Sequence, residues 1–204
     1  MASFETITIG GIAEYIHVNG SVATYEGTEI GYSLNLLLDE NTEKELRKVG
    51  EEVLKSAKSP SWRNAKGKEV PANAWKSDDE LLDSFIRTNK NGKKFVVCKA
   101  YHKDKNGNRI YVPIFDLNGR MDDEKAHKLN IYSGSEVNVE VTVYVYFNNR
   151  GMQGIKAKMR GLQVIKAVTG SGSVGSGFKF KKTADKPALT SATIDDDMDD
   201  DVPI

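Results

Sequence analysis

Two tyrosines and three basic residues recur at every second position in the last third of the chain. Tyr144 and Tyr146 alternate with valines, and Lys156, Lys158 and Arg160 alternate with small or apolar residues shortly afterwards. A repeat of two places such side chains on one face of a strand. Because aromatic rings stack on bases and cations bind phosphates, this combination is suited to binding a single-stranded nucleic acid.

The segment 136–168 is predicted to position these residues as a long antiparallel hairpin. Its first half alternates without interruption, with valines at 137, 139, 141, 143 and 145 on the apolar side. The predicted turn, Asn148–Gly151, has residue types that tolerate positive φ, and Arg150 lies within it. Because both strands bury their apolar sides in one core, the tyrosines share their face with the basic residues of the return strand. Gly161 interrupts the return strand, which predicts a bulge.

A second predicted strand pair, residues 93–115, repeats this division. Val96 and Cys98 form a small apolar side before a turn at Asp104–Asn108, and the return strand is expected to bury Ile110, Val112 and Ile114. The outward side again carries aromatic and basic residues: Phe95, Lys99, Tyr101, Lys103, Arg109 and Tyr111. If the two pairs belong to one barrel, we expect these residues to extend the binding surface.

Both tryptophans lie in residues 59–76, a stretch without periodicity. Two interpretations are open. Either Trp62 and Trp75 anchor the loop on the protein body, or the loop is a mobile arm whose indoles stack on bases beside cations such as Arg63. The second interpretation adds Trp62, Arg63 and Trp75 to the candidate DNA-binding residues.

The N-terminal part is predicted to contain short strands followed by two helices. Gly10–Gly11 is expected to separate the first two strands, and Asn19–Gly20 is a hairpin-turn signal. The predicted strands cover residues 4–9, 12–18 and 30–38.

Two capping-box patterns mark the predicted helix starts. Thr42 with Glu45 precedes an amphipathic helix of about four turns that ends near Lys58. Ser77 with Glu80 precedes a short second helix.

Composition divides the chain into three parts. Residues 1–168 form the predicted binding domain, residues 169–194 a flexible linker that begins with glycine and serine, and residues 195–204 an acidic tail. Six of the 29 acidic residues lie in the tail, so the rest of the chain carries 23 acidic against 29 basic residues. This excess of six positive charges favours a polyanion partner, and a terminal block of like charge is typical of an interaction tail.

No group of residues in the sequence has the spacing of a catalytic or metal site. The three histidines are scattered, and no serine lies in a Gly-x-Ser-x-Gly motif. A single cysteine excludes a disulfide framework and a cysteine-based zinc site, and we expect Cys98 to be buried. No apolar run approaches the ~18 residues of a membrane span, and no signal-peptide pattern is visible. We therefore expect a protein that is not an enzyme and that has no metal, no cofactor and no membrane segment.

Five or more antiparallel strands, with a helix between early and late strands, indicate a mainly β fold class. The expected architecture is an OB-fold-like antiparallel Greek-key barrel with one or two inserted helices and a disordered C-terminal tail. Barrels of this kind bind oligonucleotides on one face and through their loops.

The order of these elements and the motifs of the last third are similar to a known family. An inserted helix and a proline-containing strand precede Tyr132-x-Gly134-Ser135-x-Val137, which leads into the long strand. The return strand carries Gly154-Ile-x-Ala-x-x-x-Gly-Leu-Gln163-Val-Ile, and the chain ends Asp-Asp-Asp-Val-Pro-Ile. In these features the chain resembles the OB-fold single-stranded DNA-binding proteins of tailed bacteriophages.

The resemblance implies non-enzymatic coating and protection of single-stranded DNA, without strong sequence preference, during phage DNA replication, recombination and repair. It also implies a location in the cytoplasm of the bacterial host, homodimers, and a tail that contacts replication proteins such as DNA polymerase. The tail residues concerned are Asp195, Asp196, Asp197, Asp199, Asp200, Asp201 and Ile204. Two alternatives remain: a protein-interaction adaptor that works only through its tail, and an RNA- or duplex-binding module that uses the same basic face.

The charge of the tail also predicts an intramolecular effect. Six carboxylates on a flexible linker can reach the oppositely charged body. We expect them to compete with DNA for the basic face, most strongly at low salt.

Overall fold

The computed structural model describes residues 4–60, 62–64, 66–129, 131–148 and 150–168. The predicted linker and acidic tail lie outside these residues. The strands are β1 (Phe4–His17), β2 (Ala23–Tyr25), β3 (Thr28–Leu37), β4 (Ile86–Thr88), β5 (Lys94–Ala100), β6 (Ile114–Asp116), β7 (Gly119–Arg120), β8 (Ser135–Phe147) and β9 (Gln153–Lys166). The helices are α1 (Glu40–Ala57), the 3₁₀ turn η1 (Ala72–Ala74), α2 (Asp78–Phe85) and α3 (Asp123–Lys128).

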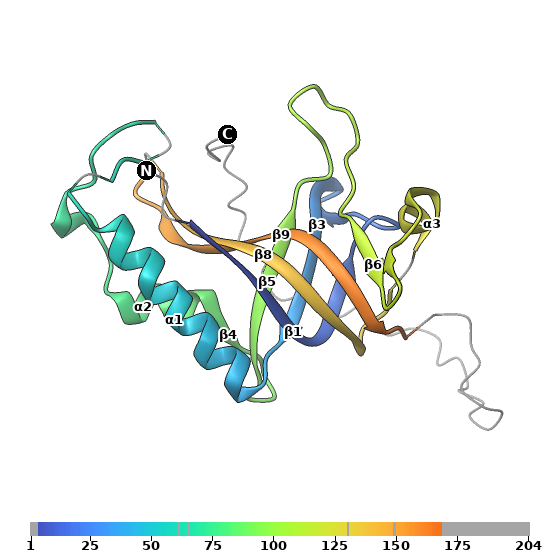
Figure 1. Ribbon diagram of the computed structural model, residues 1–204. Coiled ribbons are helices and arrows are strands. Elements are labelled where there is room, and N and C mark those ends of the chain that lie inside the picture. The colour runs from blue at the N-terminus through green and yellow to red at the C-terminus, as the bar shows by residue number, and fades with distance from the viewer. Residues whose placement is uncertain (1–3, 61, 65, 130, 149, 169–204) are drawn as a thin grey trace.

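Five of the strands close into a barrel. β1 pairs with β3 and with β8, β3 pairs with β5, and β8 pairs with β9, all of them antiparallel. β5 then pairs with β9 in parallel, and this contact closes the ring. Figure 1 shows the barrel with α1 and α2 on one side and α3 at the other end. The mainly β, OB-like barrel predicted from the sequence is confirmed.

The long hairpin forms as predicted, bulge included. Along β8 the valines at 137, 139, 141 and 143 are fully buried, and Ile155, Ala157 and Met159 of β9 face the same core. The register shifts at Gly161, because Glu140 pairs with Gly161 whereas Val141 pairs with Met159. Arg160 is the extra residue of this bulge, and Leu162 returns to the core behind it.

The first strand is longer than predicted. Gly10 and Gly11 do not separate two strands but lie within the continuous strand β1. A Cβ atom on Gly11 would lie 2.2 Å from the carbonyl oxygen of Leu37, and one on Gly10 would lie 2.8 Å from Oδ1 of Asn138. These glycines therefore allow the neighbouring strands to approach closely, which is a packing requirement that local sequence does not reveal.

A turn forms at Asn19–Gly20, with Asn19 at positive φ, but it does not join two paired strands as predicted. The hairpin joins β2 to β3 through Glu26 and Gly27, which both have positive φ. Asn19 is instead buried, with 3% of its surface exposed, and it binds a distant backbone segment. Its Nδ2 donates to the carbonyl of Val112 at 2.8 Å, and the N–H of Val112 donates to its Oδ1 at 2.9 Å.

The return strand predicted over residues 109–115 is wrong in most of its length. Lys103 and Arg109 form one bridge, but the regular strand β6 begins only at Ile114 and pairs with β7 and β9. Ile110 is 38% exposed rather than buried, whereas Val112 and Ile114 do reach the core. Asn19 occupies the backbone groups of Val112, and the next residue is Pro113, which lacks an N–H for a ladder.

One of the two predicted helix caps is shifted. The N-cap of α1 is Asp39, whose carboxylate accepts from the N–H of Thr42 at 2.7 Å, so Thr42 lies inside the helix rather than capping it. Ser77 caps α2 as predicted, because its hydroxyl accepts from the N–H of Glu80 at 3.2 Å. Cys98 is buried as expected, and burial raises the pKa of its thiol to about 12.

Candidate nucleic-acid interface

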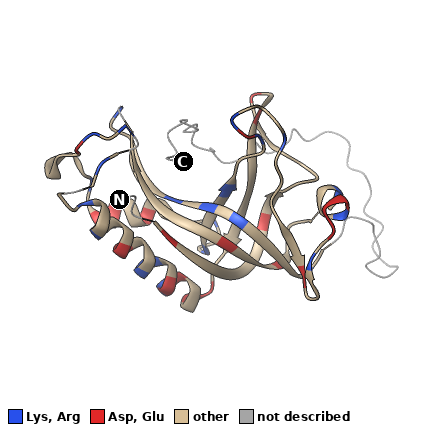
Figure 2. Ribbon diagram, turned by 45° about the horizontal axis from the view of Figure 1, so that its top comes forward, with Lys and Arg blue, Asp and Glu red and all other residues tan. Residues whose placement is uncertain are grey.

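The outward residues of β8, β9 and β5 form one continuous surface. Across β8 and β9, Tyr144 pairs with Lys156, and across the barrel closure Lys99 pairs with Lys158. Side chains at paired positions point to the same face of a sheet, so the two strand pairs of the sequence contribute to one surface. This surface, here called the binding face, consists of Lys99, Tyr101, Tyr144, Tyr146, Lys156 and Lys158. Figure 2 shows basic residues of the barrel strands close together on this side.

Two tyrosines of the binding face each carry a lysine ammonium group over the ring. The Nζ atom of Lys156 lies 4.2 Å from the ring centroid of Tyr146. The Nζ atom of Lys158 lies 5.2 Å from that of Tyr101, which comes from a different strand. A cation at this distance is attracted to the ring, and the contact restrains both side chains. Each pair therefore presents an aromatic surface and a positive charge at one place, as a base and its phosphate require.

Tyr144 lies near these two pairs and is less exposed than Tyr101. Burial raises the pKa of Tyr144, and the nearby hydroxyl groups of Tyr101 and Tyr146 raise it further. The phenol of Tyr144 therefore stays neutral at pH values where an ordinary tyrosine has begun to ionise. A partly buried ring in this position supports the flanking rings.

The helices lie on the other side of the hairpin. A Cβ atom on Gly50 of α1 would lie within 4 Å of Leu82 and Phe85 of α2 and of Ile155 of β9. Because Ile155 and Lys156 are adjacent in β9, they point to opposite faces. The tyrosines of β8 therefore do not cover α1 or α2.

Gly154 gives the ring of Tyr146 its position. The two residues are paired across β8 and β9, and the ring lies over the glycine. A Cβ atom there would lie 2.9 Å from Cε1 of Tyr146. Any larger residue at position 154 would displace this ring.

A second group of predicted residues lies on the hairpin that leaves β5. Lys103 donates to Oε2 of Glu29 at 3.0 Å, and this bond and the positive charges of Lys103 and Arg109 lower the pKa of that carboxyl. The guanidinium of Arg109 lies 5.8 Å from the ring centroid of Tyr111. Figure 1 shows this hairpin projecting from the barrel between β5 and β6.

Three other predicted residues lie at the margins. Phe95 is at the opposite end of β5 from Tyr101 and pairs with Leu37 and Arg87. Arg160 is exposed at the bulge, and Arg150 is exposed in the turn after β8.

The tryptophans anchor their loop on the protein body. Trp62 is only 7% exposed and packs edge-on against Trp75, with ring centroids 5.4 Å apart. Trp75 in turn packs on Phe147 at 5.2 Å, and Arg63 is paired with Glu69. The first of the two interpretations is confirmed, and Trp62 has no exposed ring face for a base. The interpretation of the loop as a base-stacking arm is wrong for this residue.

His127 was not among the residues predicted from the sequence. Its imidazole stacks on the ring of Tyr111, with centroids 3.5 Å apart and planes 16° from parallel. His127 belongs to the short helix α3, and no strand periodicity connects it with Tyr111. The pairing depends on how α3 packs against residues 110–113.

Within the described residues, no three His, Cys, Asp or Glu side chains lie together as a set that could hold a metal ion. No helix in the described part of the chain is long and apolar enough to cross a membrane.

A closed five-stranded barrel with a parallel closure and an outward face of tyrosines and lysines has the construction of OB-fold oligonucleotide-binding proteins. Residues 7–188 match the model of the family described as Enterobacter phage Enc34, ssDNA-binding protein. The chain therefore belongs to this family of phage single-stranded DNA-binding proteins.

Solved structures that share this fold include those of two phage proteins. The single-stranded DNA-binding protein gp2.5 of bacteriophage T7 aligns with a TM-score of 0.53 and 17% identity, over 87% of this chain and 100% of that one. The single-stranded DNA-binding protein of bacteriophage Enc34, solved in complex with ssDNA, aligns with a TM-score of 0.50 and 15% identity, over 83% and 90%. Among curated protein sequences, none matches this chain.

Proposed function

We propose that the protein binds single-stranded DNA along the binding face, without strong sequence preference, and so coats and protects the strand. The observation that carries this proposal is the pairing of β5 with β9, which puts two ring–cation pairs from different strands on one face. Membership of the phage single-stranded DNA-binding family supports it. The residues assigned to binding are those of the binding face, with Lys103, Arg109 and Tyr111 on the adjacent hairpin.

Single-stranded nucleic acid is the ligand that this geometry favours over a duplex. Bases in a duplex are stacked on each other, so exposed tyrosine rings gain nothing from them, whereas an extended strand offers every base to a ring. The lysines supply charge without reading base edges, which agrees with binding of many sequences.

The proposal is tested by fluorescence anisotropy of the full chain with labelled DNA, RNA and duplex of one length. We expect single-stranded DNA to bind at least about tenfold more tightly than duplex, with an affinity that falls as salt rises. Equal affinity for duplex or a preference for RNA would favour the second alternative. Absence of binding to all three ligands would favour the adaptor.

The biological setting and the organisation of the chain are part of the same proposal. The protein acts in phage DNA replication, recombination and repair in the cytoplasm of the bacterial host, with residues 1–168 as the binding domain and 169–194 as the linker. The acidic tail, residues 195–204, contacts replication proteins such as DNA polymerase. Its charge and terminal place support this role. Capture of a host or phage polymerase by the full chain, but not by a chain lacking 195–204, is the expected result.

We also propose a homodimer, for which the resemblance to phage single-stranded DNA-binding proteins is the support. Light scattering at concentrations near those of DNA binding measures it directly. A monomer mass at all concentrations would overturn this part of the proposal alone.

A further inference from the structure

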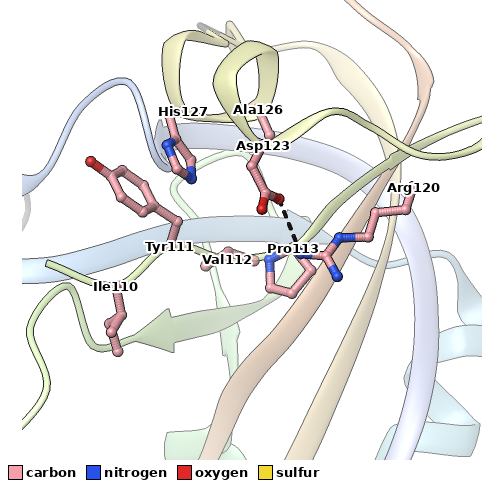
Figure 3. A pocket seen from close by; sticks show the side chains of 8 residues that line it. All are labelled: Ile110, Tyr111, Val112, Pro113, Arg120, Asp123, Ala126 and His127. Atoms are coloured by element: carbon pink, nitrogen blue, oxygen red, sulfur yellow. Dashed lines mark hydrogen bonds and ion pairs between the residues drawn. The ribbon is translucent and has the colours of Figure 1, made fainter.

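A pocket of about 290 Å³ lies beside the Tyr111–His127 stack, between residues 110–113 and α3. Figure 3 shows Tyr111 and His127 at one end, and Arg120 with Asp123 at the other. Val112, Pro113 and Ala126 form an apolar wall between them. The Arg120 guanidinium donates to Asp123 at 3.0 Å, and both side chains are largely exposed.

This pocket continues the row of ring–cation pairs on the binding face. In the hairpin after β5, Lys103 pairs with Arg109, and the N–H of Ile110 donates to the carbonyl of His102 at 2.9 Å. Tyr101 and Tyr111 each lie two residues beyond this bridge, at the base of the hairpin. The ammonium group of Lys158 lies over the ring of Tyr101, and the guanidinium of Arg109 lies over the ring of Tyr111. Ring–cation pairs are therefore present both on the barrel and beside the pocket.

We propose that the pocket is a subsite for one nucleotide of the bound strand, beyond the binding face. This inference rests on the proposed function and extends the path of the DNA to α3. The base lies against the apolar wall beside the Tyr111–His127 stack, and Arg120 holds the phosphate. The volume is at the lower limit for ligand pockets, about 300–1,000 Å³, which suits a single nucleotide rather than several.

The chemistry of the lining favours a nucleotide over a purely apolar or a purely anionic ligand. A flat ring matches an aromatic stack and an aliphatic wall, and a phosphate matches an exposed arginine. To bind the phosphate, Arg120 must give up its exposed ion pair with Asp123. Such an exchange costs little, because an ion pair in water contributes ~0–1 kcal/mol.

The test is photocrosslinking of the full chain to a 4-thiothymidine oligonucleotide of about 16 residues, within the range bound by one OB fold. Mass spectrometry of the crosslinked peptides is expected to find Tyr111 or His127 as well as Tyr101 or Tyr146. In His127→Ala and Arg120→Gln the crosslink at Tyr111 is expected to fall, and the affinity for this oligonucleotide to weaken about five- to tenfold. Lys128→Gln removes a charge from the same helix outside the pocket and is expected to change neither.

The outcomes separate this inference from the proposed function. Crosslinks confined to the binding face, with wild-type affinity in His127→Ala and Arg120→Gln, would overturn the subsite and leave the proposed function standing. Equal weakening in Lys128→Gln would also overturn it, because a general loss of charge would then explain the effect. Absence of binding by the unaltered chain would overturn both.

Discussion

Removal of the ring of Tyr101 is the sharpest test of the binding face. This ring is 40% exposed, carries Lys158 at 5.2 Å, and lies at the junction of the barrel with the hairpin after β5. A base stacked on it contributes about 1–3 kcal/mol, so Tyr101→Ala is expected to weaken single-strand binding about 5- to 150-fold. The assay is fluorescence anisotropy of a labelled oligonucleotide at several salt concentrations.

Lys158→Gln is expected to act differently, because it removes a phosphate contact rather than a stacked base. The slope of log affinity against log salt should fall by about 0.7, the value for one single-strand phosphate. The slope in Tyr101→Ala should stay as in the wild type. Because the ring and the ammonium group touch, the double variant should lose less than the sum of the two single losses, by about 0.5–1 kcal/mol.

Matched controls are available elsewhere on the surface. Tyr132→Ala removes an exposed tyrosine just before the start of β8, and Lys48→Gln removes an exposed charge from α1. Both are expected to bind DNA like the wild type. Wild-type affinity in a folded Tyr101→Ala protein, or an equal loss in Tyr132→Ala, would refute the assignment of the binding face.

Three further predictions concern a ring position, a buried amide and the tail. Gly154→Ala should displace the ring of Tyr146 and weaken DNA binding several-fold. The cost in stability should be small, because the clashing atoms are at the end of a side chain that can move. Unchanged affinity would show that this ring does not contact DNA. Asn19→Ala should lower the free energy of unfolding, measured by urea titration, by about 2–5 kcal/mol, because it leaves the N–H and the carbonyl of Val112 unsatisfied. A loss below about 1 kcal/mol would contradict the two hydrogen bonds between Asn19 and Val112. Deletion of 195–204 should tighten single-strand binding, most at low salt, and equal affinities at low salt would refute competition by the tail.

The sequence determined two of the three strands that carry the binding face, β8 and β9. Period-two alternation specifies which side of β8 and β9 is buried, because neighbouring residues in an extended strand point in opposite directions. Tyr144, Tyr146, Lys156 and Lys158 could therefore be placed on one face from local pattern alone. The bulge at Gly161 followed from the same parity, since the apolar positions change phase there.

Signals that depend on contacts across the fold were not predictable in this way. Asn19 lies in a turn, as its sequence indicates, but the turn joins no hairpin, and its side-chain amide is satisfied by Val112, far along the chain. Gly10 and Gly11 have the appearance of a break, but they serve close packing between strands. In each case the residue type suited two roles, and the tertiary environment selected one.

The same division applies to the site. Alternation by itself determined that tyrosines and lysines share strand faces. Composition by itself determined that residues 1–194 carry an excess of positive charge and that residues 195–204 are acidic. Only the tertiary structure decided that Lys99 lies beside Lys158, that Trp62 is buried and that His127 stacks on Tyr111. The physical reason is that alternation is a property of adjacent residues, whereas barrel closure and helix docking depend on the packing of segments far apart in the chain.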